Sequence, residues 1–184
     1  MAVGLVRRLF VFGSMVFVSA CGAATAPASG SPGVTGVRSD ADVFRLVTQT
    51  DPFSRYTAFP LADEFTTGRL NGSEAHTPVV RVLLNATASS ALRDGRLPLG
   101  GSFPDGAVVF KEVRASASAQ PSLYVVMVKD RENGLSGSGW LWAEYTPSGA
   151  TAFSVDRRGS GCISCHQREA GPQRDLVRTF ERQR

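Results

Sequence analysis

The sequence predicts an α+β fold in which a predominantly antiparallel β-sheet is accompanied by a few helices. Several apolar runs rich in β-branched and aromatic residues follow one another, separated by short turns rich in glycine, proline and aspartate. Consecutive strands joined by short turns pair in antiparallel fashion. Helix-like apolar spacing is confined to short segments. A compact cysteine–histidine motif, Cys162-Ile-Ser-Cys165-His166, follows the last expected strand near the C-terminus.

The expected elements can be justified in chain order. The first is a helix with Asp40 as its N-cap and an apolar face formed by Val43, Phe44, Leu46 and Val47. The expected strands are 79–84, 107–113, 123–129, 140–145 and 151–155, with a short helix over 86–93 and a terminal helix over 175–180. The turn Phe103-Pro-Asp-Gly106 leads into the second strand. The two-residue period of a strand puts Trp140 and Trp142 on the same side.

Residues 1–20 have the features of a lipoprotein signal peptide. Arg7 and Arg8 precede an apolar run over 9–18 that is shorter than the roughly 20 residues of a spanning helix. The following Val-Ser-Ala-Cys21 resembles a bacterial lipobox, in which the cysteine is acylated and becomes the new N-terminus. The alternative is ordinary signal cleavage nearby with a free Cys21. We therefore expect lipidation of Cys21 and a location on the periplasmic side of a bacterial membrane.

The remaining chain divides into a flexible tether, 21–39, and a single globular domain, 40–184. The tether is rich in small residues, glycine and proline, which cannot bury enough apolar surface to order themselves. Removal of Arg7 and Arg8 with the signal lowers the formal net charge from +4 to +2. The chain also lacks a lysine-rich tract or a nucleic-acid-binding motif, so we expect no nucleic-acid partner.

The pentapeptide Cys162-x-x-Cys165-His166 is the attachment signature of c-type haem. Two thiols three positions apart on one helical turn can each add to a haem vinyl group, and the adjacent imidazole can ligate the iron. The alternatives are a zinc site, a thioredoxin-like thiol pair or a chance match. A zinc site needs a distant fourth ligand, for which only His76 and Cys21 remain among histidines and cysteines. We expect one covalent haem c, an exported location that agrees with it, and no disulfide.

The order of several motifs resembles the cytochrome P460 family, which includes the β-sheet type of cytochrome c prime. These motifs are Ser73-Glu-Ala-His76, Val80-Arg-Val-Leu-Leu-Asn85, Phe103-Pro-Asp-Gly106 with Lys111-Glu112, Val125-Val-Met-Val-Lys129, Gly139-Trp-Leu-Trp142 and Cys162-x-x-Cys165-His166. The resemblance covers roughly residues 55–180. It implies a predominantly β fold, one haem c per subunit, His166 as the proximal ligand, an open distal face and commonly a homodimer.

The family divides by chemistry. The P460 enzymes oxidise hydroxylamine and carry a lysine cross-linked to the haem, to which Lys111 corresponds best and Lys129 less well. The alternative is that Lys111 is an ordinary strand lysine. The active enzymes also use a distal carboxylate on the strand before the haem motif, where Asp156 is the only acid. Asp156 is either that base or a surface residue paired with the neighbouring arginines.

The second branch of the family, the cytochrome c prime type, binds nitric oxide or carbon monoxide in a pocket capped by aromatic side chains. Candidates for such a cap are Phe59, Phe65, Phe103 and Phe110, each of which could equally be a core residue. Met127 in a strand and His76 in a loop are poorly placed as sixth iron ligands. We therefore expect an open haem site that binds small gaseous or nitrogenous ligands. The alternatives are hydroxylamine oxidation and simple electron transfer to a redox partner.

Overall fold

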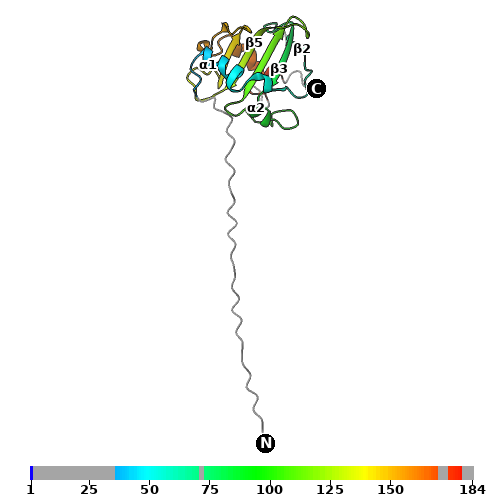
Figure 1. The fold of residues 1–184 in the computed structure, drawn as a ribbon, viewed down its shortest axis with the longest axis vertical. Coiled ribbons are helices and arrows are strands. Elements are labelled where there is room, and N and C mark those ends of the chain that lie inside the picture. The colour runs from blue at the N-terminus through cyan, green and yellow to red at the C-terminus, as the bar shows by residue number, and fades with distance from the viewer. Residues whose placement is uncertain (2–35, 71–72, 170–173, 180–184) are drawn as a thin grey trace.

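The computed structural model describes Met1 and residues 36–70, 73–169 and 174–179 (Figure 1). A seven-stranded antiparallel sheet dominates this part of the chain, in the order β1-β3-β4-β5-β6-β7, with β2 also paired to β3. The strands are β1 (Thr57–Ala58), β2 (Thr66–Thr67), β3 (Val79–Leu84), β4 (Val108–Arg114), β5 (Pro121–Lys129), β6 (Trp140–Tyr145) and β7 (Thr151–Phe153). The predicted α+β class with a predominantly antiparallel sheet is confirmed.

The helical elements are short. They are α1 (Asp40–Arg45), the π-helix η1 (Leu46–Thr50), the 3₁₀ turn η2 (Phe53–Arg55), α2 (Ala86–Ser90), the 3₁₀ turn η3 (Val155–Arg157), α3 (Cys162–His166) and the 3₁₀ turn η4 (Gln167–Glu169). None of the helices in the described residues is long and apolar enough to cross a lipid bilayer. The expected signal peptide, the lipidation site Cys21 and most of the tether lie outside the described residues.

The sequence patterns located the long strands within about two residues, and two helix expectations were wrong. Ser39, not Asp40, is the N-cap of α1, because its Oγ accepts a hydrogen bond of 3.2 Å from the Asp42 amide. No α-helix forms over the described residues 174–179. Asp175 and Leu176 there have φ angles of 41° and 67°, in the left-handed region that an α-helix does not use.

Each face of the sheet carries its own apolar cluster. On one face α1 and η1 lie across the strands (Figure 1), and Val43, Leu46 and Val47 pack against Phe110 and other strand residues. The other face carries a second apolar cluster that includes Val109, Met127 and Trp142. Because neighbouring side chains on a strand point to opposite faces, one sheet serves both clusters.

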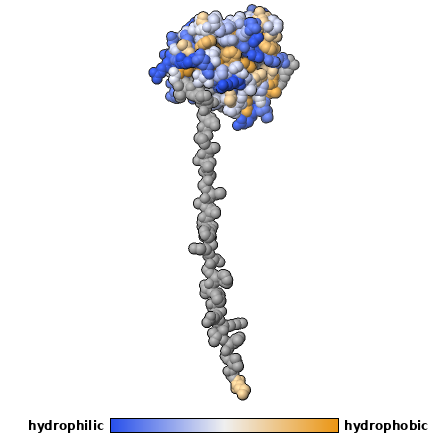
Figure 2. Space-filling view, viewed as in Figure 1, coloured by the Kyte–Doolittle hydropathy of each residue, from blue (hydrophilic) through white to orange (hydrophobic). Residues whose placement is uncertain are grey.

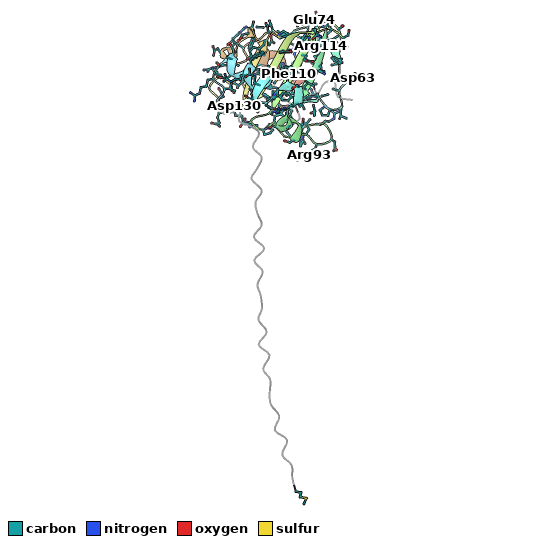
Figure 3. The ribbon with its side chains drawn as sticks, viewed as in Figure 1. Asp63, Glu74, Arg93, Phe110, Arg114 and Asp130 are labelled. Atoms are coloured by element: carbon teal, nitrogen blue, oxygen red, sulfur yellow. The ribbon has the colours of Figure 1, made fainter. Side chains whose placement is uncertain are left out.

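Few large apolar side chains remain outside these clusters. Among the described residues, the exposed large hydrophobic ones are Met1, Leu61 and Leu99. Figure 2 shows hydrophilic and hydrophobic residues interspersed over the face that it draws. Figure 3 places Phe110 within the body of the domain and Asp63 and Arg93 at its periphery. Most large apolar side chains of the described residues are therefore packed inside the domain.

Asn85 is the polar residue that joins β3 to the start of β4. It is 2% exposed, and its Oδ1 accepts hydrogen bonds of 2.9 Å from the amides of Ala88 and Val108. Its Nδ2 donates to the carbonyl of Gly106 at 2.9 Å and to Asp51 Oδ2 at 3.1 Å. The bond from Ala88 caps α2, those with Val108 and Gly106 hold the turn that leads into β4, and the bond to Asp51 connects Asn85 to the end of η1. A buried side chain with four such bonds is costly to remove.

Substitution of the two N-cap residues should therefore have unequal effects. Asn85→Ala leaves buried backbone groups without partners, so we expect it to lower the free energy of unfolding by about 3 kcal/mol. Ser39→Ala removes a solvent-exposed cap and should cost about 1 kcal/mol. Urea unfolding of both variants checks this. Equal losses would contradict the role assigned to Asn85.

Candidate functional site

The helix α3 brings the cysteine–histidine motif to the second face of the sheet. Cys162 and Cys165 stand three positions apart, so they lie on the same side of a single turn. The chain enters this turn through Gly159, whose φ is 71°. A Cβ at position 159 would lie 2.5 Å from Trp142 Cδ1, so only glycine allows the turn to approach β6 this closely.

His166 is held by a backbone carbonyl. Its Nδ1 lies 2.7 Å from the carbonyl oxygen of Leu176, and its ring meets Trp142 edge-to-face with the centroids 4.8 Å apart. Burial, reinforced by the positive charge of Lys111, lowers the pKa of His166 to about 3, so the imidazole is neutral at physiological pH. A neutral imidazole that donates from Nδ1 keeps its lone pair on Nε2. That nitrogen is then available to a metal ion.

The two cysteines are free thiols that line the same pocket as His166. Burial raises the pKa of Cys162 to about 11, with the negative charge of Glu144 adding to the effect. The guanidinium of Arg178, which is 4% exposed, lies 2.8 Å from Cys165 Sγ. The motif is therefore assembled on one wall, with a buried cation beside its second thiol.

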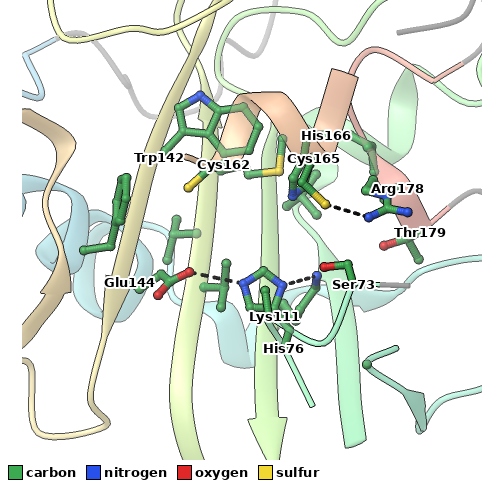
Figure 4. Close-up of a pocket in the computed structure, with 18 of the residues that line it drawn as sticks. Ser73, His76, Lys111, Trp142, Glu144, Cys162, Cys165, His166, Arg178 and Thr179 are labelled. Carbon is green, nitrogen blue, oxygen red and sulfur yellow. Dashed lines mark hydrogen bonds and ion pairs between the residues drawn. The ribbon is translucent and has the colours of Figure 1, made fainter. Parts of the chain in front are cut away.

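Three polar side chains form a row on another wall of the pocket (Figure 4). Lys111 on β4 and Glu144 on β6 both pair with Val125 of β5, so all three lie in register on one face. His76 lies between the two, with Nδ1 3.2 Å from Lys111 Nζ and Nε2 3.1 Å from Glu144 Oε1. Burial and the Lys111 charge lower the pKa of His76, against the opposing effect of Glu144. Glu144 was not among the residues singled out from the sequence.

The pocket between these walls is mostly apolar, opens to solvent and has a cavity volume of about 120 Å³. Its apolar lining residues include Val109, Val125, Met127, Trp142 and Phe153. Its polar lining residues include Ser73, Arg178 and Thr179 (Figure 4). A broad apolar pocket with a few convergent polar groups is typical of a cofactor or ligand site.

The aromatic residues at this pocket are not those that sequence reasoning proposed. Phe110 lies on the opposite face, stacked on Phe53 with ring centroids 4.3 Å apart. Phe59 and Phe103 are core residues, and Phe65 lies beside the guanidinium groups of Arg81 and Arg114. Trp142 and Phe153 line the pocket instead. The strand period put Trp142 on the same side as Trp140, but the sequence did not tell which face of the sheet would receive α3.

Some of the other site residues predicted from the sequence line the pocket and others do not. Asp156 is exposed on η3 and is not among the residues that line the pocket. Lys129 is buried in an ion pair with Asp175, with 2.9 Å between Nζ and Oδ1, and does not line the pocket either. Lys111, His76 and Met127 do line it. His76 is thus a pocket residue, although it lies in a loop before β3.

The donor set fits a haem better than a zinc ion. Two free thiols, a neutral imidazole on the same helical turn and a wide apolar cavity match covalent attachment of a large apolar ring. Within the part of the chain that the structure describes, no three His, Cys, Asp or Glu side chains form a group able to hold a metal ion. The zinc alternative thus lacks a fourth ligand there.

These features define a haem-binding protein built on an antiparallel sheet. The family model of cytochrome P460 matches residues 63–179, which include β2 to β7, the pocket and the cysteine–histidine motif. The chain belongs to the cytochrome P460 family, and it is accordingly a c-type haem protein. No curated protein sequence matches it.

Proposed function

We propose that this chain is an exported cytochrome that carries one haem covalently on Cys162 and Cys165, with His166 as the axial iron ligand. The observation that carries the proposal is the 2.7 Å contact between His166 Nδ1 and the Leu176 carbonyl, in a pocket that both thiols line. It supports an imidazole with Nε2 available to iron. When bound, the haem supplies an iron that binds a small ligand and exchanges electrons.

The substrate that the geometry supports best is a small nitrogenous compound such as hydroxylamine. Oxidation of hydroxylamine releases protons together with electrons, so the site needs a base. Glu144 is the candidate for that base, in place of Asp156, because it lines the pocket and contacts His76 at 3.1 Å. His76 can pass a proton between Glu144 and Lys111, since its two ring nitrogens contact one residue each. The electrons would leave through a redox partner protein.

Lys111 adds a second argument for this chemistry. The P460 enzymes carry a lysine cross-linked to the haem, and Lys111 is the lysine that lines the pocket in the described part of the chain. Its Nζ lies 3.2 Å from His76 Nδ1. Such a bond requires the lysine amine to reach the haem, and the contact with His76 holds Nζ inside the pocket.

Binding of nitric oxide or carbon monoxide without turnover is the second candidate function. It is favoured by the apolar lining of the pocket, in which Val125, Met127 and Phe153 surround the polar row. Simple electron transfer is supported less well, because it prefers a sixth ligand from the protein. Met127 is a core residue, and both ring nitrogens of His76 already have partners.

We also propose that the domain is anchored by a lipid on Cys21 after removal of residues 1–20, on the periplasmic side of a bacterial membrane. The support is the lipobox-like Val-Ser-Ala-Cys21 behind a short apolar run. Each buried acyl CH₂ contributes about 0.8 kcal/mol, so several chains together anchor stably. In detergent partitioning we expect the wild-type protein in the detergent phase and the Cys21→Ser variant in the aqueous phase. Both proteins in the aqueous phase would refute the anchor.

Covalent attachment can be tested by mass. Protein produced with cytochrome c maturation machinery should carry the mass of one haem after denaturation and organic extraction. The Cys162→Ala/Cys165→Ala variant should lose it, because no thioether remains. A matched Ser164→Ala variant within the same turn should keep it. Haem that stays bound in the double cysteine variant would overturn the attachment site.

Variants of Lys111 and Glu144 can distinguish hydroxylamine oxidation from gas binding. If Lys111 is cross-linked, the ferrous Soret band of the wild type is shifted far to the red, and Lys111→Ala restores an ordinary c-type spectrum. Glu144→Gln keeps a side chain that can contact His76 but accepts no proton, so it should lower kcat for hydroxylamine oxidation by about 10²-fold. The control Asp156→Asn should leave kcat unchanged. Unchanged spectra and no hydroxylamine turnover in the wild type would favour gas binding instead.

A further inference from the structure

Asp175 makes several hydrogen bonds from the segment, residues 174–179, that carries the carbonyl partner of His166. Its Oδ1 accepts from Lys129 Nζ at 2.9 Å, and its Oδ2 accepts from the Phe103 amide at 2.8 Å. Its own carbonyl accepts from Trp140 Nε1 at 3.1 Å. The ends of β5 and β6 and the turn before β4 thus converge on this one residue.

The partners of Asp175 are buried. The side chain of Lys129 is 4% exposed and that of Asp175 is 14% exposed. The Lys129 ammonium also lies 4.7 Å from the centroid of the Trp140 ring, and Trp140 itself is fully buried. A buried ion pair with further hydrogen bonds has little freedom to rearrange, because each displaced group would leave another without a partner.

The backbone beside this ion pair has an unusual conformation. Asp175 and Leu176 both have positive φ, which is strained for residues other than glycine and rare for one as large as leucine. Such a conformation persists only where surrounding contacts impose it. The contacts of Asp175 supply that constraint immediately before Leu176, whose carbonyl accepts from His166 Nδ1 at 2.7 Å.

We propose that Asp175 and Lys129 are positioning residues for the axial histidine. They hold the strained backbone so that the Leu176 carbonyl meets His166 Nδ1, and in this way they set the donor strength of Nε2 toward iron. A strong hydrogen bond from Nδ1 makes an imidazole a better donor and stabilises the oxidised metal. The inference rests on the proposed haem attachment at His166, and it concerns residues outside the haem-attachment motif.

Two charge-removing variants test this proposal in the haem-loaded protein. Asp175→Asn and Lys129→Gln each break the ion pair, so each should weaken the bond from His166 to Leu176. We expect both to raise the reduction potential and to shift the ferrous iron–histidine stretching band to lower frequency. A purely electrostatic effect of the lost charges predicts opposite signs instead, since loss of a negative charge raises the potential and loss of a positive charge lowers it.

A matched control is available on the opposite face of the sheet. Glu112 is 2% exposed and contacts Arg81 Nε at 2.8 Å and Arg114 Nη2 at 2.9 Å. Glu112→Gln should therefore destabilise the domain through a buried ion pair without moving the potential or the Raman band. The double variant Asp175→Asn/Lys129→Gln leaves no buried charge unpaired. Where a single variant fails to fold, the potential and the Raman band are measured on this double variant instead.

The outcomes separate the two proposals. Absence of covalent haem in the wild type would refute the attachment proposal. Haem-loaded variants with unchanged potential and Raman band, or with shifts of opposite sign, would overturn the positioning role alone. So would an equal shift in Glu112→Gln, or unfolding of the single and double variants alike, because the pair would then act only on general stability.

Discussion

The hydrogen bond between His166 Nδ1 and the Leu176 carbonyl is the contact on which the rest of the site depends. It fixes which ring nitrogen carries the proton, and thereby leaves the Nε2 lone pair available to a metal. An isolated five-residue helix such as α3 could not hold this orientation by itself. The sheet supports it from two directions, through Trp142, which meets the imidazole ring edge-to-face, and through the strand residues that bond Asp175 beside the strained backbone at Leu176.

The two faces of the sheet differ in how they are covered. One face is covered by α1 and η1 and forms a closed apolar core. The other is covered only in part, by loops and by α3, so that an apolar pocket remains along β4, β5 and β6. A large apolar ring in that pocket would complete the core of this face, which couples cofactor binding to stability. The polar row of Lys111, His76 and Glu144 crosses this face because strand register aligns its two strand residues on either side of Val125.

The sequence was sufficient to predict the strands of the sheet. Apolar runs separated by turn residues indicate strands through local periodicity, which does not depend on tertiary contacts. The sequence was also sufficient for the cysteine–histidine motif, whose spacing is local. It could not identify Glu144, since a single acid in the strand Trp140–Tyr145 reads as a solvated position until the fold shows which face receives α3. The backbone near Leu176 was missed for a similar reason. Its apolar and basic residues fit a helix, and the positive φ angles arise from long-range contacts to Lys129, Phe103 and Trp140.

A crystal structure of the haem-loaded protein is the most direct test of this account. It should contain thioether bonds to Cys162 and Cys165 and an iron bound by His166 Nε2, with Nδ1 within hydrogen-bond distance of the Leu176 carbonyl. The polar row of Lys111, His76 and Glu144 should lie at the haem rather than in solvent. An iron bound through another residue, or a His166 ring turned away from Leu176, would contradict the central claim.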